Sequence, residues 1–111
     1  MENKSSVDSI NNSNNTVLHY ACDNNTISPE IIKYLIENKS KINETNNRIN
    51  TALHRACDNL NYNLDIIKIL VENKSDINAK NHGGFTPLHC ASLNKNLSLE
   101  LIKLLGNLIF F

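Results

Sequence analysis

The amino-acid sequence predicts an all-α fold of stacked helix pairs, and two observations on its periodicity lead to that class. First, the pattern Thr-x-Leu-His-x-Ala begins at Thr16, Thr51 and Thr86, so that it recurs with a period of 35 residues. Second, an aliphatic segment that ends in lysine recurs with the same period, as Ile31-Ile32-Lys33, Ile66-Ile67-Lys68 and Leu101-Ile102-Lys103. A fixed period of this length is typical of repeat proteins, in which each repeat is a small unit that packs on its neighbours.

Each repeat contains signals for the start of two helices. The threonine that opens the first segment is a suitable N-cap, and Pro87 takes the first helical position of the third copy, where the missing N–H costs nothing. The second helix follows a serine or asparagine and carries an acid in its first turn, which the helix dipole favours. We therefore expect helices to begin near Thr16, Ser28, Thr51, Asn63, Thr86 and Ser98.

The apolar residues follow helical spacing in both segments. In the middle repeat, the first helix is expected to bury one face, made of Leu53, Ala56, Cys57 and Leu60. The second helices carry the stripe of a helix that packs against a neighbour, at Ile31, Ile32, Leu35 and Ile36 and again at Ile66, Ile67, Leu70 and Val71. Because aromatic residues are few and tryptophan is absent, this core must be aliphatic.

The three copies of Thr-x-Leu-His-x-Ala, each followed by an aliphatic segment, resemble the signature of the ankyrin-repeat family. The resemblance spans residues 2–105 and implies an all-α ankyrin-repeat solenoid of stacked helix pairs with short β-hairpin connections. We expect repeats at 16–50 and 51–85 and a partial C-terminal repeat with a divergent apolar tail at 86–111. Residues 1–15 would hold the tail and hairpin of a preceding, incomplete repeat, because Glu2-Asn3-Lys4-Ser5 matches the end of a second helix.

The sequence departs from the family pattern in its period and after its second helices. The period is 35 residues, whereas the family period is about 33, which predicts a longer first helix or a longer loop between the helices of each repeat. Lys39 and Lys74 stand where the family usually has glycine. Since a left-handed lysine is strained, we expect Asn38 or Asn73 to take that conformation instead.

The hairpin tips depart from the pattern as well. Glycine is kept at positions 83 and 84, and Asn14 is a plausible substitute for it in the first copy. Ile49 in the middle copy is a poor substitute, because a β-branched residue resists a positive φ angle. We therefore expect the hairpin around 46–50 to be distorted.

The composition argues against several classes of function. Eleven basic and eleven acidic residues balance, so the chain lacks the electrostatic footprint of a protein that binds nucleic acid or an anionic membrane. Three cysteines and a polar segment after Met1 argue against a disulfide framework and a signal peptide. Together with the absence of a long apolar span, this predicts an intracellular, cytoplasmic protein that binds neither nucleic acid nor membrane.

Two pairs of histidine and cysteine are candidates for a metal site or a catalytic site, because their members stand three residues apart. They are His19 with Cys22 and His54 with Cys57. Such pairs could bind a metal ion, but the third copy has serine in place of cysteine. Packed helices also lie about 8–10 Å apart, too far for two pairs to share one Zn²⁺. A histidine repeated at a fixed period favours a scaffold role over catalysis, and no phosphate-binding loop accompanies it. We therefore expect no enzymatic activity, no metal and no cofactor. The family resemblance implies that each histidine hydrogen-bonds the backbone of the adjoining turn.

The last residues leave the repeat pattern and turn apolar, ending in Leu108-Ile109-Phe110-Phe111. Three interpretations remain open for this tail: a docking segment or weak membrane contact, a cover for the end of the stack, and the truncation of a longer array. We expect Leu108, Ile109 and Phe110 to fold back against the last helix pair of a marginally stable monomer, because a missing capping repeat loses apolar burial.

The family resemblance places a partner protein in the groove formed by the hairpin tips and the first helices. Mapped onto this sequence, the candidate binding residues are Tyr20, Asp23, Asn47, Arg48, Asn50, Arg55, Asp58, Asn59, His82, Phe85, Cys90 and Leu93. Tyr20, Arg55 and Phe85 belong to the residue types that most often act as hot spots, so we expect Arg55→Ala and Phe85→Ala to weaken binding. The leading hypothesis is a protein–protein interaction module. The alternative is a structural spacer or a non-functional fragment of a longer ankyrin array.

Overall fold

The computed structural model describes residues 10–24 and 26–106 of the chain. The expectations for the segment 2–5 and for the folding-back of Leu108, Ile109 and Phe110 lie outside the described residues. Within the described residues the chain forms six α-helices: α1 (Val17–Asp23), α2 (Pro29–Glu37), α3 (Ala52–Asp58), α4 (Leu64–Glu72), α5 (Pro87–Ser92) and α6 (Leu99–Gly106). Each helix begins within one residue of the start that the sequence predicts.

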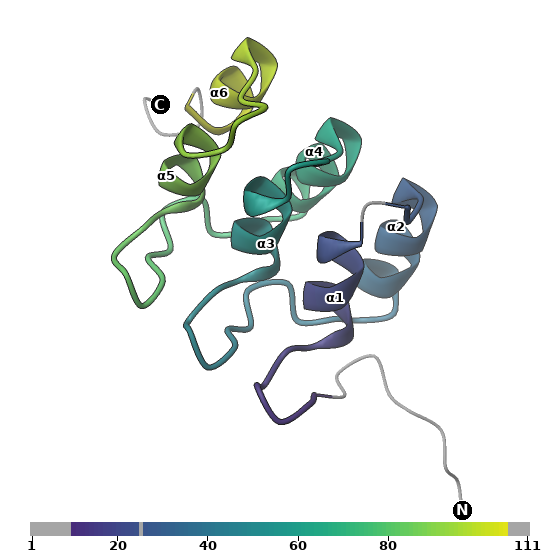
Figure 1. The fold of residues 1–111 in the computed structure, drawn as a ribbon. Helices are drawn as coiled ribbons and strands as arrows, with labels where there is room; N and C mark the ends of the chain where they lie inside the picture. Colours follow the sequence, from purple (N-terminus) through teal and green to yellow (C-terminus); the bar gives the residue numbers. More distant parts are fainter. Residues whose placement is uncertain (1–9, 25, 107–111) are drawn as a thin grey trace, which may run out of the picture.

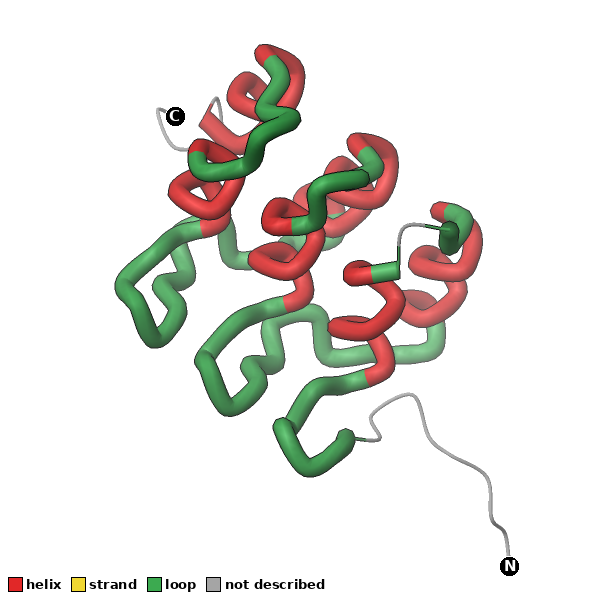
Figure 2. The backbone as a smooth tube through the Cα atoms, in the orientation of Figure 1, coloured by secondary structure: helices red, strands yellow, loops and turns green. Residues whose placement is uncertain are grey.

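The helices are arranged as three pairs that stack along the long axis of the molecule (Figure 1). One layer holds the first helices, where α1 contacts α3 and α3 contacts α5, and the other holds the second helices, where α2 contacts α4 and α4 contacts α6. The molecule measures 48 × 28 × 27 Å, as expected for an elongated stack. The loops that precede the first helices project together from one side of the stack (Figure 2).

The core runs between the two layers and is aliphatic. Its fully buried side chains come from all three helix pairs and include Leu18, Ile32, Leu53, Ile67, Leu70, Leu101 and Leu105. Two expected core residues are exposed. Leu60 lies beyond the end of α3, so it is not on the face of that helix, and Ile31 lies on the end of the stack, where the described residues provide no neighbouring repeat.

The first helices are short, so the long period is accommodated between the helices of each pair. α1 and α3 have 7 residues each and α5 has 6. The residues between the helices of each pair, at 24 and 26–28, at 59–63 and at 93–98, therefore form the interhelical loops. Of the two options that the sequence left open, the structure has the longer loop.

Lysine takes the left-handed conformation after α2 and α4, so the prediction that Asn38 or Asn73 would take it was wrong. The φ angles of Lys39 and Lys74 are 71° and 75°. After α2, the Lys39 N–H donates to the Ile36 carbonyl at 3.0 Å and the Ser40 N–H to the Leu35 carbonyl at 3.0 Å. This is the Schellman pattern of helix ends, which places the left-handed residue one position after the cap.

The loops before the first helices share one conformation, so the predicted distortion at 46–50 was wrong as well. Ile49 has a φ angle of 59°, close to the 60° of Asn14, while Gly84 has 82°. An asparagine at the start of each loop explains this conformation. The Asn46 side-chain oxygen accepts the N–H groups of Arg48 at 2.9 Å and Asn50 at 3.0 Å, and Asn11 and Asn81 do the same in their loops.

The expected β-hairpins are present only as these asparagine-ordered loops. Among residues 10–24 and 26–106, the structure contains one isolated antiparallel bridge, between Ile10 and Thr16, and no strand. In each loop a side-chain amide oxygen accepts two backbone N–H groups, which are then not free to extend the two backbone hydrogen bonds of the loop into a ladder.

Candidate functional site

Asparagine side chains join each projecting loop to the next, which fixes the loops as a row. The Asn46 amide nitrogen donates to the Asn15 side-chain oxygen at 2.7 Å, and the Asn81 amide nitrogen donates to that of Asn50 at 2.9 Å. Backbone bonds run in parallel, because the Asn47 N–H donates to the Ser13 carbonyl at 3.0 Å. The abundance of asparagine, about one residue in five, is therefore explained in part by its use between repeats.

The repeated histidines connect the first helices to the loops. In α3, the His54 Nδ1 atom accepts the Thr51 N–H at 3.1 Å, so that Thr51 and His54 form a capping box. The Nε2 atom lies 2.8 Å from the Phe85 carbonyl of the following loop, and His19 makes the equivalent bond to the Asn50 carbonyl at 2.8 Å. Since Nδ1 accepts, the proton lies on Nε2, and burial lowers the pKa of both histidines, which favours this neutral form. The backbone-bonding role that the family resemblance implied is thus confirmed.

The cysteines pack in the interior beside these histidines. Burial raises the pKa of Cys22 to about 12 and also raises that of Cys57, so both thiols stay protonated and apolar at neutral pH. In the part of the chain that the structure describes, no three side chains of His, Cys, Asp or Glu lie close enough together to hold a metal ion. No described helix has the length and apolar character needed to cross a bilayer.

Three neighbouring hollows lie on the side where the loops project. The largest, about 620 Å³, lies between the loops that precede α3 and α5 and is lined by Asn47, Arg48, Asn50, Asn81, His82, Gly83 and Phe85. The second, about 220 Å³, extends along α3 and α5 and adds His54, Arg55, Asp58, Cys90 and Leu93. The third, about 140 Å³, reaches the first loop at Ser13 and Asn15. Because the three hollows share residues, they form one surface, which we call the loop-side groove.

The structure places nine of the twelve candidate binding residues in the loop-side groove. They are Asn47, Arg48, Asn50, Arg55, Asp58, His82, Phe85, Cys90 and Leu93. Phe85 and Leu93 are exposed apolar side chains, and Arg48 and His82 are exposed as well. The Phe85 ring lies 6.1 Å from the ring of His89, between ring centres. The groove thus combines apolar and basic side chains with several amides.

The other three candidates lie beside the groove and hold the scaffold together. Arg55 donates to the Asp23 carboxylate at 2.7 Å, which forms an ion pair between the first and second repeats. The Asn59 amide donates to the Asp23 carbonyl at 3.1 Å. Tyr20 is exposed, and its hydroxyl accepts a hydrogen bond from the Asn11 amide. Asp23 and Asn59 are therefore already occupied by contacts within the chain.

Cys90 offers a partner little surface, in contrast to the expectation from its position in the sequence. Its side chain is only 7% exposed, whereas that of Leu93, one turn further along, is 70% exposed. Burial also raises the pKa of the Cys90 thiol, to about 11. The end of α5 explains the difference, because Leu93 is the C-cap residue and points away from the core that covers Cys90.

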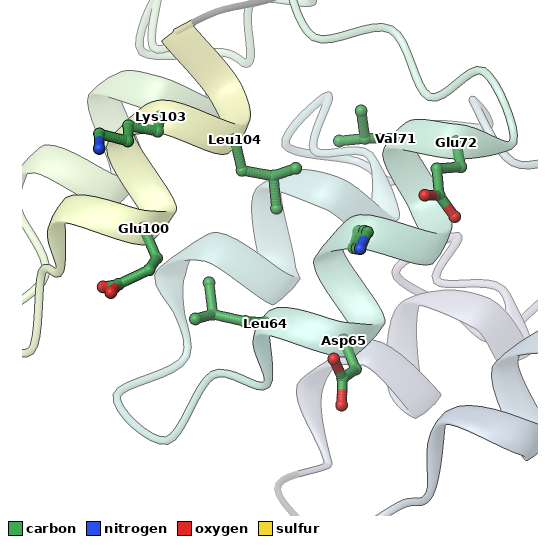
Figure 3. Close-up of a pocket in the computed structure, with 8 residues that line it drawn as sticks. Leu64, Asp65, Val71, Glu72, Glu100, Lys103 and Leu104 are labelled. Carbon is green, nitrogen blue, oxygen red and sulfur yellow. The ribbon is translucent and has the colours of Figure 1, made fainter.

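A further hollow that the sequence analysis missed lies between the second helices, away from the loops. It has a volume of about 550 Å³, and its walls come from α4 and α6. Figure 3 shows Leu104 of α6 directed toward the gap, with Leu64 and Val71 on α4. Charged side chains of both signs surround these three residues: Asp65, Lys68, Glu72, Glu100 and Lys103. The heptad-like spacing of Leu64 and Val71 was the signal in the sequence that could have indicated it.

Comparison with known proteins agrees with this architecture. The family model for ankyrin repeats (3 copies) matches the chain twice, at residues 1–81 and 28–108, so that the two overlapping matches cover almost the whole sequence. No curated protein matches the chain. The repeated capping boxes, the stacked helix pairs and these matches lead to one conclusion: the chain belongs to the ankyrin-repeat family.

Proposed function

We propose that the chain binds another protein in the loop-side groove. Ankyrin repeats are in general protein–protein interaction modules, and they are typically not enzymes. The observation that carries the proposal is the position of exposed Phe85 at the largest hollow, between two loops that are hydrogen-bonded to each other. Large exposed side chains beside a concave, pre-formed surface are the usual anchors of such interfaces.

The charge of the groove favours a partner segment with an acidic residue beside an apolar one. The largest hollow is lined by Arg48 and His82 and by no acid. Arg55 is held by Asp23, so its charge is partly compensated, whereas Arg48 has no ion pair among the described residues. An acidic side chain bound near Arg48 would place its neighbour against the Phe85 ring, where apolar contact is available.

The rest of the proposal concerns what the chain does not bind and where it acts. The equal numbers of acidic and basic residues support a partner other than nucleic acid or membrane. Three buried, free cysteines support an intracellular, reducing environment such as the cytoplasm. We propose that the chain is largely monomeric when dilute.

The test is a quantitative pull-down with the purified chain, followed by titration calorimetry with the protein that it recovers. We expect Phe85→Ala and Arg48→Ala to weaken binding, each by about 1–3 kcal/mol, and Arg55→Ala to weaken it less. Lys33→Ala, on the exposed face of α2, is the matched control and should leave the affinity unchanged. Circular dichroism must show equal helicity for all variants.

Two results would contradict the proposal. Equal loss of binding in Lys33→Ala and Phe85→Ala would mean that the groove has no special role. Loss in Lys68→Ala alone would move the partner to the hollow between α4 and α6. If no specific partner is recovered at all, the alternative of a structural spacer or a non-functional array fragment takes the place of this function.

A further inference from the structure

The two ends of the stack carry opposite halves of the interface that joins the repeats. Within the chain, the same positions meet twice at the 35-residue offset: α1 and α2 contact α3 and α4, and these contact α5 and α6. The first repeat therefore presents the surface that the second and third repeats turn toward their predecessor. The third repeat presents the surface that the first and second turn toward their successor. We call these surfaces the N-terminal end face and the C-terminal end face.

Apolar side chains are uncovered on the N-terminal end face at positions that are buried elsewhere. Ile31 is 47% exposed, whereas its equivalent in the middle repeat, Ile66, is 4% exposed. Tyr34 is 62% exposed, and its equivalent Ile69 is 8% exposed. In the middle repeat, these positions are covered by the preceding repeat, because α2 packs against α4. Among the described residues, no helix pair covers the N-terminal end face.

The C-terminal end face shows the complementary pattern. Ile102 is 38% exposed, whereas the equivalent residues of the other repeats, Ile32 and Ile67, are both fully buried at 0%. Leu99 is exposed, while Leu64 at the same position is partly buried and faces α6 across the hollow of Figure 3. Among the described residues, no following helix pair covers this side, whereas α4 and α6 cover the equivalent positions of the first and second repeats.

Polar groups at the two ends are complementary as well. His19 and His54 each bond the carbonyl of the following loop, at Asn50 and Phe85. In the described residues the Nε2 atom of His89 has no such partner, and the carbonyl of Asn15, equivalent to those of Asn50 and Phe85, receives no histidine. One end has the donor, and the other end has the acceptor.

The ion pair beside the loop-side groove also has equivalent positions on the two end faces, but apolar residues occupy them. Between the first and second repeats, Asp23 pairs with Arg55 at 2.7 Å. When the repeats are aligned by their 35-residue period, Leu93 of the third repeat is equivalent to Asp23 of the first, and Leu93 lies on the C-terminal end face. Tyr20 of the first repeat is equivalent to Arg55 of the second, and Tyr20 lies on the N-terminal end face. Both are exposed apolar side chains, so an apolar pair would replace the ion pair when the two end faces meet.

We propose that two copies of this chain stack head to tail, with the C-terminal end face of one on the N-terminal end face of the other, at the offset used within the chain. His89 of one copy then bonds the Asn15 carbonyl of the next, Leu93 packs on Tyr20, and Ile102 is covered together with Ile31 and Tyr34. The occupant is a second copy because its end face carries the matching group at each of these positions. Such an interface is heterologous, so it extends with concentration instead of closing as a symmetric dimer.

The experiment is sedimentation equilibrium of the 111-residue chain and three variants over a wide range of concentration. We expect the weight-average mass of the unmodified chain to rise steadily above that of the monomer. Tyr34→Asp blocks the N-terminal end face and Ile102→Asp blocks the C-terminal end face, so each alone should associate at least about tenfold more weakly. A 1:1 mixture of the two should form dimers and nothing larger, because each supplies the one intact face that the other needs.

Leu60→Asp is the matched control, since Leu60 is an exposed apolar residue on a loop of the middle repeat, away from both end faces. It should associate like the unmodified chain. Circular dichroism must show a folded protein in every case, and Leu99→Asp replaces Ile102→Asp if the latter unfolds. A chain that stays monomeric at every concentration overturns the proposal. So does a mixture that stays monomeric, or dimerisation that persists in either single variant.

Discussion

Replacing His54 by alanine tests how much the bond between a first helix and the following loop contributes to stability. His54 is almost fully buried, its Nδ1 atom accepts the Thr51 N–H at 3.1 Å, and its Nε2 atom donates to the Phe85 carbonyl at 2.8 Å. The substitution leaves a buried N–H without an acceptor, which costs about 1–3 kcal/mol. The Phe85 carbonyl keeps the Asn81 N–H at 2.9 Å, so it is not left unpaired.

The void left by the ring adds to this loss, and the expected total for His54→Ala is roughly 3–5 kcal/mol. His89→Ala is the internal comparison, because His89 forms the same capping box with Thr86 but is exposed, and its Nε2 atom bonds no carbonyl in the part of the chain that the structure describes. Loss of a cap alone costs about 1 kcal/mol. Against a total stability of about 5–15 kcal/mol, the difference between the two variants is large.

The assay is urea unfolding followed by far-ultraviolet circular dichroism, with the free energy of unfolding taken by linear extrapolation. We expect a clear fall in the midpoint for His54→Ala and a small one for His89→Ala, at unchanged slope. Equal losses in the two variants would refute the reasoning, because they would show that burial and the Nε2 bond of His54 add nothing to the cap.

Four further predictions follow from the same structure. Burial lowers the pKa of His19 and His54 below the ordinary 6.5, so on acidification the unfolded chain takes up protons before the folded one does. The melting temperature should therefore be constant above about pH 6.5 and fall below it. A melting temperature that rises on acidification would contradict this. The buried thiols of Cys22 and Cys57 should react slowly with a thiol reagent in the native state and rapidly in denaturant. Because these histidines and cysteines are used in caps and packing, a chelator should leave the melting temperature unchanged, and a large drop would reveal a bound ion. Ile49→Gly should raise the urea midpoint, since relief of the left-handed strain, about 1–2 kcal/mol, exceeds the entropy cost of glycine, about 0.5–1 kcal/mol.

The sequence predicted those features that depend on residues close together in the chain. The capping boxes join residues three apart, as in Thr51 and His54, so the pattern alone located the starts of α1, α3 and α5. The turn at Lys39 also depends on nearby residues, but the conformational preference of asparagine over lysine led to the wrong prediction that Asn38 would be left-handed. The two backbone hydrogen bonds that end α2 determine which position turns left-handed, and they outweigh the strain of a lysine there.

Features that depend on the offset between neighbouring repeats were not predictable from the pattern. The bond between Asn46 and Asn15 crosses 31 residues. Asn46 recurs with the 35-residue period as Asn11 and Asn81, but this period does not show which side chain each asparagine bonds in the neighbouring repeat. The same limit explains why Cys90 was taken for a groove residue with free surface and why the hollow between α4 and α6 was missed. The volume left between two helices depends on how closely they pack.

The asparagine bonds between loops have a consequence for the way this surface can vary. Amides carry no net charge, so a scaffold that they hold together is insensitive to ionic strength, whereas exposed ion pairs are screened by salt. Only one ion pair, between Arg55 and Asp23, occurs among the described residues. Arg48 and His82 of the loop-side groove take part in no ion pair among the described residues, so their side chains can be exchanged without loosening the stack that presents them. Cohesion in the groove therefore rests on its amides and on Arg55, and a change of charge at the other positions leaves that cohesion in place.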